Sequence, residues 1–216
     1  MKIELNNLTF SYKKRSAPVL EGVGAVFEQG KRYALTGRNG SGKTTLANLI
    51  LGLLKPQNGN ILINGEDAAK MSAALRAKKI GYLFQNPDLQ LFAPTVMEEL
   101  AFPFELTGTL TEEKQDELQR MLTIFHLNGM EERFPLTMSG GEKQRLALAT
   151  VMSRHAEFLI LDEPTSAIDR ECRSFLTNFI NGFAGGALVI THDEELIASL
   201  DSPHLLKLEG GRVHEA

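Results

Sequence analysis

A glycine-rich segment at residues 37–44 constrains this chain more than any other part of its sequence. It reads Gly-Arg-Asn-Gly-Ser-Gly-Lys-Thr and follows a short apolar strand predicted at 33–35. After it, apolar residues recur at helical spacing as far as Lys55-Pro56, namely Leu46, Leu49, Ile50 and Leu53. Residues 37–44 match G-x-x-x-x-G-K-T, the pattern of a phosphate-binding loop, and they lie between a predicted strand and a predicted helix, as this motif requires. The segment therefore predicts an α/β fold built around a phosphate site.

The residue types of the loop suit an anionic ligand. Glycines let backbone amides curl around a phosphate because no Cβ stands in the way, and the following helix directs its positive end to the same place. We expect Lys43 to reach the β- and γ-phosphates and the Thr44 hydroxyl to bind Mg²⁺. The alternative for this segment alone is a glycine-rich turn that caps a helix. The candidate nucleotide-binding residues are Gly37, Asn39, Gly40, Ser41, Gly42, Lys43, Thr44 and Thr45.

A second apolar strand supplies acidic partners for this loop. Residues 158–161, Phe-Leu-Ile-Leu, have the composition of a buried strand and are followed by Asp162 and Glu163. We expect Asp162 to hold Mg²⁺ through water and Glu163 to polarise the attacking water as a general base. An apolar strand that ends in two acids is common, and the alternative is an ordinary strand end. Its place downstream of a phosphate loop favours the functional interpretation.

The order of the remaining elements agrees with an α/β chain. Alternating residues at 2–5 and 8–12 predict early strands, 13–18 a polar turn, and 23–27, 61–63 and 187–190 further strands. From 87 to 136 the pattern is mostly helical, with Thr111 as an N-cap and an apolar stripe of Leu118, Met121, Leu122 and Phe125. Another helix is predicted from about residue 141. Strands that alternate with helices indicate a parallel sheet.

Composition excludes several classes of protein. The 216 residues carry a net charge of −4 with scattered cations, which argues against a general nucleic-acid binder. A single cysteine excludes an internal disulfide framework, and no apolar run exceeds four residues, so no membrane-spanning segment is expected. Because the start has no apolar signal-peptide core, we expect the chain to remain in the cytosol.

The most discriminating segment is Ser139-Gly140-Gly141-Glu142, hereafter the signature segment. Ser139 and Glu142 have the spacing of a capping box that opens a helix, and such a helix start with two glycines can also hold a phosphate. Together with the loop at 37–44 and the acids at 162–163, the signature segment makes the sequence resemble the ABC-transporter ATPases. The resemblance covers essentially the whole chain. The resemblance implies ATP with Mg²⁺, and a signature segment that binds the γ-phosphate held by a second subunit. Glu142 stands where the family more often has Gln.

Other site residues follow from the resemblance, position by position. Tyr12 matches the aromatic residue that stacks on adenine, with a buried core aromatic as the alternative. Gln85 resembles the glutamine that senses Mg²⁺ and the attacking water, and Asp169 lies in a loop resembling the one that crosses the dimer interface. His192, after the strand at 187–190, matches the histidine that contacts the γ-phosphate. The other histidines, at 126, 155, 204 and 214, are interpreted as surface or packing residues.

The resemblance also implies an architecture. We expect a P-loop NTPase with a RecA-like parallel sheet core, an N-terminal antiparallel β subdomain and an inserted helical subdomain. In these terms 1–85 and 140–216 form the nucleotide-binding core with the β subdomain, and 86–139 the helical signature subdomain.

A narrower resemblance comes from residues 84–92, Phe-Gln-Asn-Pro-Asp-Leu-Gln-Leu-Phe, and the following 94–102. These are similar to ATPases of energy-coupling-factor importers of vitamins or transition-metal ions. The implied partners are a second ABC ATPase in an ATP-dependent homo- or heterodimer, a transmembrane coupling subunit and a substrate-binding membrane subunit, at the cytoplasmic face of the membrane. No nucleic-acid partner is expected.

Three alternatives remain at this stage. The chain could serve another class of ABC transporter, or it could be a soluble ABC protein of DNA maintenance or translation. The absence of a long coiled-coil pattern and the single phosphate loop argue against the soluble classes. A small-molecule kinase with a phosphate loop is disfavoured by the signature segment.

Overall fold

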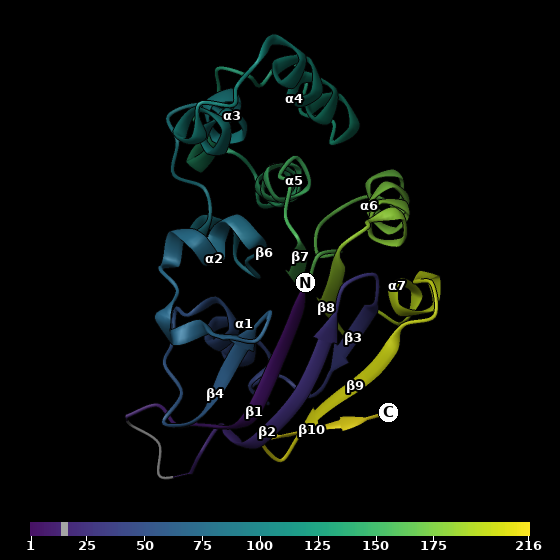
Figure 1. Ribbon diagram of the computed structural model, residues 1–216. Coiled ribbons are helices and arrows are strands. Elements are labelled where there is room, and N and C mark those ends of the chain that lie inside the picture. Colours follow the sequence, from purple (N-terminus) through teal and green to yellow (C-terminus); the bar gives the residue numbers. More distant parts are fainter. Residues whose placement is uncertain (14–16) are drawn as a thin grey trace. The chain divides into compact units, whose positions relative to one another are not determined.

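The computed structural model describes residues 1–13 and 17–216 and divides into two compact units (Figure 1). The first unit comprises Met1–Tyr82, Ala156–Glu163 and Ile180–Ala216, and the second comprises Leu83–His155 and Pro164–Phe179. The helix that starts at the signature segment and residues 164–179 thus belong to the second unit, whereas the sequence-based division assigned them to the core. The polar turn predicted at 13–18 includes residues 14–16, which lie outside the described residues.

The predicted N-terminal antiparallel sheet is present in the first unit. Within its first strand, Ile3 and Leu5 are buried, but the next buried residues are Leu8 and Phe10, so the buried positions change from odd to even. A bulge at Asn7, whose φ is +52°, absorbs the extra residue. The two strands predicted at 2–5 and 8–12 are therefore one strand. The sheet has the order β2-β1-β4-β5, with β1 at Lys2–Phe10, β2 at Leu20–Glu28, β4 at Asn58–Ile63 and β5 at Glu66–Asp67.

The second sheet of this unit is largely parallel, as the alternation of strands and helices predicted. Its order is β10-β9-β3-β8-β7-β6, and β3 pairs in parallel with both β8 and β9, as β7 does with β8. Figure 1 shows β3, β8 and β9 side by side. Every residue of β7 and β8 is buried, which explains their continuous apolar sequences. The bounds are Arg32–Thr36 for β3, Ile80–Leu83 for β6, Phe158–Asp162 for β7, Gly186–Ile190 for β8, His204–Glu209 for β9 and Arg212–Glu215 for β10.

Short helices complete the first unit. The helix after the phosphate loop ends at Gly52, earlier than the predicted stop at Lys55-Pro56, because Gly52 adopts a left-handed conformation with φ of +78° and its N–H caps the helix. The helices of this unit are α1 at Lys43–Leu51, α2 at Ala73–Lys79, α7 at Glu194–Ser199 and the single turn η1 at Ala68–Lys70.

The second unit is helical, as predicted for 87–136. Thr111 caps its helix by accepting a hydrogen bond from the Lys114 amide at 3.2 Å, and the predicted stripe of apolar residues is buried. The helices are α3 at Val96–Thr107, α4 at Glu112–Ile124, α5 at Gly140–Met152, the single turns η2 at Pro87–Leu89 and η3 at Pro135–Thr137, and α6 at Arg170–Gly182, whose last residues belong to the first unit. No helix in the described part of the chain has the length and hydropathy needed to cross a bilayer.

Candidate nucleotide-binding site

The phosphate loop connects β3 to α1 at the carboxyl edge of the parallel sheet. Gly37, Gly40 and Gly42 all have positive φ, at +148°, +78° and +111°. At Gly37 a Cβ would stand 2.5 Å from the Leu208 carbonyl oxygen, so the backbone conformation and the space both require glycine. The described loop therefore has the shape in which successive amides can surround an anion.

Side chains of the phosphate loop are directed toward the backbone of the loop itself. The Lys43 ammonium donates to the carbonyls of Gly37 at 2.7 Å and Arg38 at 3.3 Å, while the residue is only 9% exposed. The Ser41 hydroxyl oxygen is buried and, among the residues that the structure describes, has no hydrogen-bond partner. A buried polar atom without a partner indicates a ligand position. Asn39 is exposed at the turn of the loop.

Tyr12 approaches the end of this loop. Its hydroxyl lies 3.2 Å from Thr45 Oγ1, and its ring meets Phe10 edge to face at 5.0 Å. The side chain is 42% exposed, so the alternative of a buried core aromatic is wrong. An exposed ring beside a phosphate loop is available to stack on a base.

Thr44, in the first turn of α1, meets Asp162, the last residue of β7. The Thr44 hydroxyl donates to Asp162 Oδ2 at 2.6 Å, and Asp162 is 2% exposed at the end of β7. Burial, the first cause, raises the pKa of the Asp162 carboxyl above its usual value, and the Thr44 hydrogen bond opposes this. A buried carboxylate beside a hydroxyl forms a pair of oxygen ligands of the kind that Mg²⁺ prefers.

Glu163 lies next to Asp162 and contacts the end of β8. Its carboxylate Oε1 is 2.9 Å from His192 Nδ1, and its Oε2 accepts from the Thr191 hydroxyl at 3.4 Å. The Glu163 backbone has a φ of +52°, a left-handed conformation held by a hydrogen bond from its N–H to the Ile190 carbonyl. Sequence reasoning missed Thr191, although a threonine directly after a buried strand was a usable signal.

The signature segment belongs to the second unit. Ser139 Oγ accepts from the Glu142 amide at 3.3 Å and Glu142 Oε2 accepts from the Ser139 amide at 2.7 Å, which completes the predicted capping box. The Ser139 N–H bond is the main reason that the pKa of Glu142 is lowered. Gly141 lies against the loop before α6, since a Cβ there would stand 3.0 Å from the Ala167 carbonyl. Gly140 faces open space.

Asp169 and Gln85 are also residues of the second unit. Asp169 Oδ1 accepts from the Cys172 amide at 2.9 Å, and this bond is the main reason that the pKa of Asp169 is lowered. Gln85 is exposed between β6 and η2. The structure thus brings together Lys43, Thr44 and Asp162, Thr45 with Tyr12, and Glu163 with His192. The other predicted residues, Gln85, Ser139, Gly140, Gly141 and Asp169, belong to the second unit.

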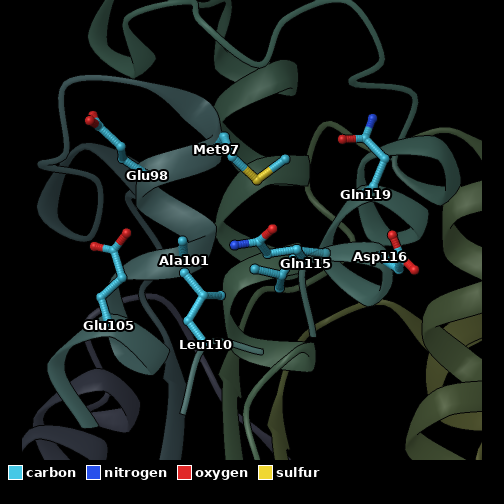
Figure 2. Close-up of a pocket in the computed structure, with 9 residues that line it drawn as sticks. Met97, Glu98, Ala101, Glu105, Leu110, Gln115, Asp116 and Gln119 are labelled. Carbon is cyan, nitrogen blue, oxygen red and sulfur yellow. The ribbon is translucent and has the colours of Figure 1, made fainter. Parts of the chain in front are cut away.

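The second unit also contains a groove of about 430 Å³ (Figure 2). Figure 2 shows Glu98 and Glu105 on one side of it and Asp116 and Gln119 on the other. Its lining comes from α3, α4 and the connection between them, and includes none of the residues predicted for the site.

Comparison with known proteins places the chain in a family. The model of the ABC transporter family matches residues 20–166. The energy-coupling factor transporter ATP-binding protein EcfA1 of Thermotoga maritima is 39% identical over 99% of this chain and 80% of the relative. A Pyrococcus furiosus protein named only as an ABC transporter ATP-binding protein is 36% identical over 98% of this chain and 81% of its own length.

A solved structure agrees with the sequence comparisons. The ATP-binding subunit of an ABC transporter superposes with a TM-score of 0.86 at 28% identity, and covers 99% of this chain and 88% of the other. The predicted P-loop α/β fold is therefore confirmed. The chain belongs to the ABC transporter family, as an ATP-binding subunit that hydrolyses ATP.

Proposed function

We propose that this ATPase drives an importer of the energy-coupling-factor type, whose transported substrates are vitamins or transition-metal ions. The name of the Thermotoga maritima relative and the segment at 84–92 support this assignment. The second candidate is another class of ABC transporter, because the name of the Pyrococcus furiosus relative specifies no class. The observation that carries the catalytic part is the convergence of Lys43, Thr44, Asp162 and Glu163 at one edge of the parallel sheet.

The phosphate loop binds the nucleotide in this proposal. The amides of 37–44 surround the β- and γ-phosphates. The Lys43 ammonium exchanges its hydrogen bonds to two loop carbonyls for hydrogen bonds to phosphate oxygens. The exposed ring of Tyr12 stacks on adenine. Both roles follow the positions of these side chains around the start of α1.

The residues present fit a magnesium ion. Thr44 Oγ1 and Asp162 Oδ2 are oxygen donors 2.6 Å apart, and the partnerless Ser41 hydroxyl lies in the same loop. Thr44 and Asp162 would hold the ion, Asp162 through water, and Gln85 is a further metal contact only by the family resemblance. Bound there, Mg²⁺ neutralises charge on the phosphates.

Glu163 accepts the proton of the attacking water. The hydrogen bonds from His192 and Thr191 fix the two oxygens of its carboxylate, so the group is oriented before substrate binds. His192 is 82% exposed at its side chain, which leaves the imidazole able to contact the γ-phosphate as well. Orientation of the base and neutralisation of the phosphate are thus supplied by neighbouring side chains.

A complete site requires two chains in this account. Ser139, Gly140 and Gly141 at the start of α5 contact the γ-phosphate held by the loop of a second copy, and Asp169 lies in the loop that crosses the interface. Both half-sites are present in this chain, so two copies suffice. ATP closes the dimer and hydrolysis reopens it.

An aromatic patch of the second unit is proposed to contact the membrane subunits from the cytoplasmic side. Phe92 and Phe102 meet edge to face at 4.8 Å, yet Phe92 is 61% exposed, and Leu106, one turn further along α3, is 75% exposed. Large apolar side chains left in solvent in this way favour contact with another protein.

The test of the catalytic assignment is Glu163→Gln. Gln keeps the size of the side chain but cannot accept the proton, so turnover of Mg-ATP should fall by about 10² to 10⁴-fold while ATP still binds. The matched control is Glu157→Gln, which removes an acid that precedes the same strand and pairs with Lys79 at 2.7 Å. Steady-state phosphate release measures both variants. Full turnover by Glu163→Gln would refute the assignment.

The test of the transporter assignment is recovery of partners from native membranes. The wild-type chain should co-purify with integral membrane subunits, and Phe92→Asp should lose them because a charge is buried in the contact. Leu205→Asp, a change at an exposed residue of β9, should retain them. Recovery of DNA or ribosomes in place of membrane subunits would contradict the proposal.

A further inference from the structure

Three side chains of the second unit converge outside the site described above. His126 follows the end of α4, Asp169 precedes α6 and Cys172 lies in the first turn of α6. One ligand atom from each lies within 4.8 Å of the other two. His126 Nδ1 is 3.5 Å from Asp169 Oδ2, and Cys172 Sγ is 3.7 Å from the same oxygen.

We propose that His126, Asp169 and Cys172 form a binding site for a divalent transition-metal ion of the zinc and cobalt class. An imidazole, a carboxylate and a thiolate are the ligand types that zinc takes in proteins, and a thiolate disfavours Mg²⁺ and Ca²⁺. Tetrahedral angles at zinc put such donor atoms about 3.4 to 3.6 Å apart. The distances from Asp169 Oδ2 to His126 Nδ1 and to Cys172 Sγ, 3.5 and 3.7 Å, are within a few tenths of an ångström of that range.

The other nitrogen of the ring has a partner of its own. His126 Nε2 is 3.4 Å from Glu171 Oε2, so the carboxylate can hold the N–H form at Nε2 and leave Nδ1 free to ligate. A carboxylate on the far nitrogen is the common arrangement at zinc-bound histidines. Asp169 is similarly oriented, because its Oδ1 accepts the Cys172 amide while Oδ2 faces the cluster.

The backbone at His126 points to a role for its side chain. Its φ is +53°, and its N–H and that of Leu127 bond back to Thr123 and Leu122 in the pattern that ends a helix. Glycine or asparagine fits this conformation at lower cost, so the helix end alone does not explain a histidine.

The charges and the thiol set the conditions for binding. The charges that act on the Cys172 thiol are the negative charges of Asp169 and Glu171 and the positive charge of Arg145, so their sum is negative and favours a cation. Burial, the first cause, raises the pKa of the Cys172 thiol to about 11, so metal binding displaces a proton from sulfur. Asp169 is also placed at the dimer interface by the proposed function, so metal and dimer would use the same carboxylate. That consequence rests on the proposed function, whereas metal binding does not.

The test uses the full chain without an affinity tag, reduced and freed of metal, in the absence of ATP. Titration with Co²⁺ should give one equivalent bound with a thiolate-to-cobalt charge-transfer band, and Zn²⁺ should displace the cobalt. Because the 216 residues contain a single cysteine, this band can come only from Cys172. No such band at excess Co²⁺ would overturn the proposal.

Variants separate the ligands from the fold. His126→Asn suits the left-handed backbone and should bind Co²⁺ at least tenfold more weakly, and Cys172→Ser, which keeps a donor toward the Ile124 carbonyl, should lose the band. The matched control is His155→Asn, a histidine of the same unit that lies 3.5 Å from the Lys114 ammonium, and it should bind normally. Unchanged affinity in His126→Asn would also overturn the proposal. ATP turnover of His126→Asn in Mg²⁺ buffer free of transition-metal ions should match the wild type, which shows that the variant is folded.

Discussion

At the scale of single residues, the site depends on side chains held by strained backbone. Glu163 adopts a left-handed conformation that costs a residue with a Cβ about 1 kcal/mol. The hydrogen bond of its N–H to Ile190 and the contacts of its carboxylate with Thr191 and His192 offset this cost. The hydrogen bonds therefore fix the direction of the carboxylate, which the proposed role of Glu163 as a general base requires.

Gly37 provides a prediction about the phosphate loop. In Gly37→Ala the new methyl group meets the Leu208 carbonyl at 2.5 Å and φ of +148° is strained, so the free energy of unfolding should fall by at least about 2 kcal/mol. The control is Gly30→Ala, where φ is +75° but nothing lies within 4 Å, and the loss should be about 1 kcal/mol. Urea denaturation measures both. Equal losses would contradict the steric account.

The loop residues were predictable because their chemistry is contiguous in sequence. Residues 37–44 and 162–163 each lie directly after a predicted strand and before a turn or helix, so the sequence around each segment supports its interpretation. The cluster of His126, Asp169 and Cys172 was not predicted, since two of its members were interpreted as isolated residues. Only the packing of the α4 end against the start of α6 brings them together.

At the scale of helices, capping by side chains defines where the functional segments begin. Ser139 caps α5 and Thr111 caps α4, each by accepting an amide hydrogen bond from the residue three positions on. The two caps share this bond, but only Ser139 lies in the signature segment and has the reciprocal bond of a capping box. Substitutions of the two capping residues can therefore distinguish an effect on stability from an effect on ATP turnover.

Removal of the two caps should give different phenotypes. Ser139→Ala and Thr111→Ala should each lower the free energy of unfolding by about 1 kcal/mol, because each leaves an amide without its partner. Only Ser139→Ala should also slow ATP turnover, by tenfold or more, since its hydroxyl is proposed to reach the nucleotide of the second copy. Denaturation and phosphate release on the same samples check this. Wild-type turnover by Ser139→Ala would argue against that role.

Long patterned elements were predictable, and short ones were not. The thirteen residues of α4 show a cap and a complete apolar stripe, and the four apolar residues at 158–161 mark β7. Helices α2 and α7 have seven and six residues, too few for a helical period to recur. The hairpin of β9 and β10 was also missed, because its exposed charged residues weaken the apolar signal. The bulge at Asn7 divided one strand into two apparent ones.

At the scale of the whole molecule, the residues proposed for the catalytic site are distributed over two compact units. The phosphate loop, Asp162 and Glu163 belong to the first unit, and the signature segment and Asp169 to the second. In the proposed account the second unit of one copy completes the site in the first unit of the other. Hydrolysis then becomes a property of the pair, which is how a chain of this kind can convert ATP turnover into movement of membrane partners.

The most direct test of this central claim is the mass of Glu163→Gln in solution, measured by light scattering with and without saturating Mg-ATP. We predict the mass of one chain without nucleotide and twice that mass with it, because ATP binds but is not hydrolysed. The double variant Glu163→Gln with Ser139→Ala should show a much smaller shift, since the signature segment has lost a contact to the nucleotide. A mass that stays at one chain in saturating Mg-ATP would contradict the account.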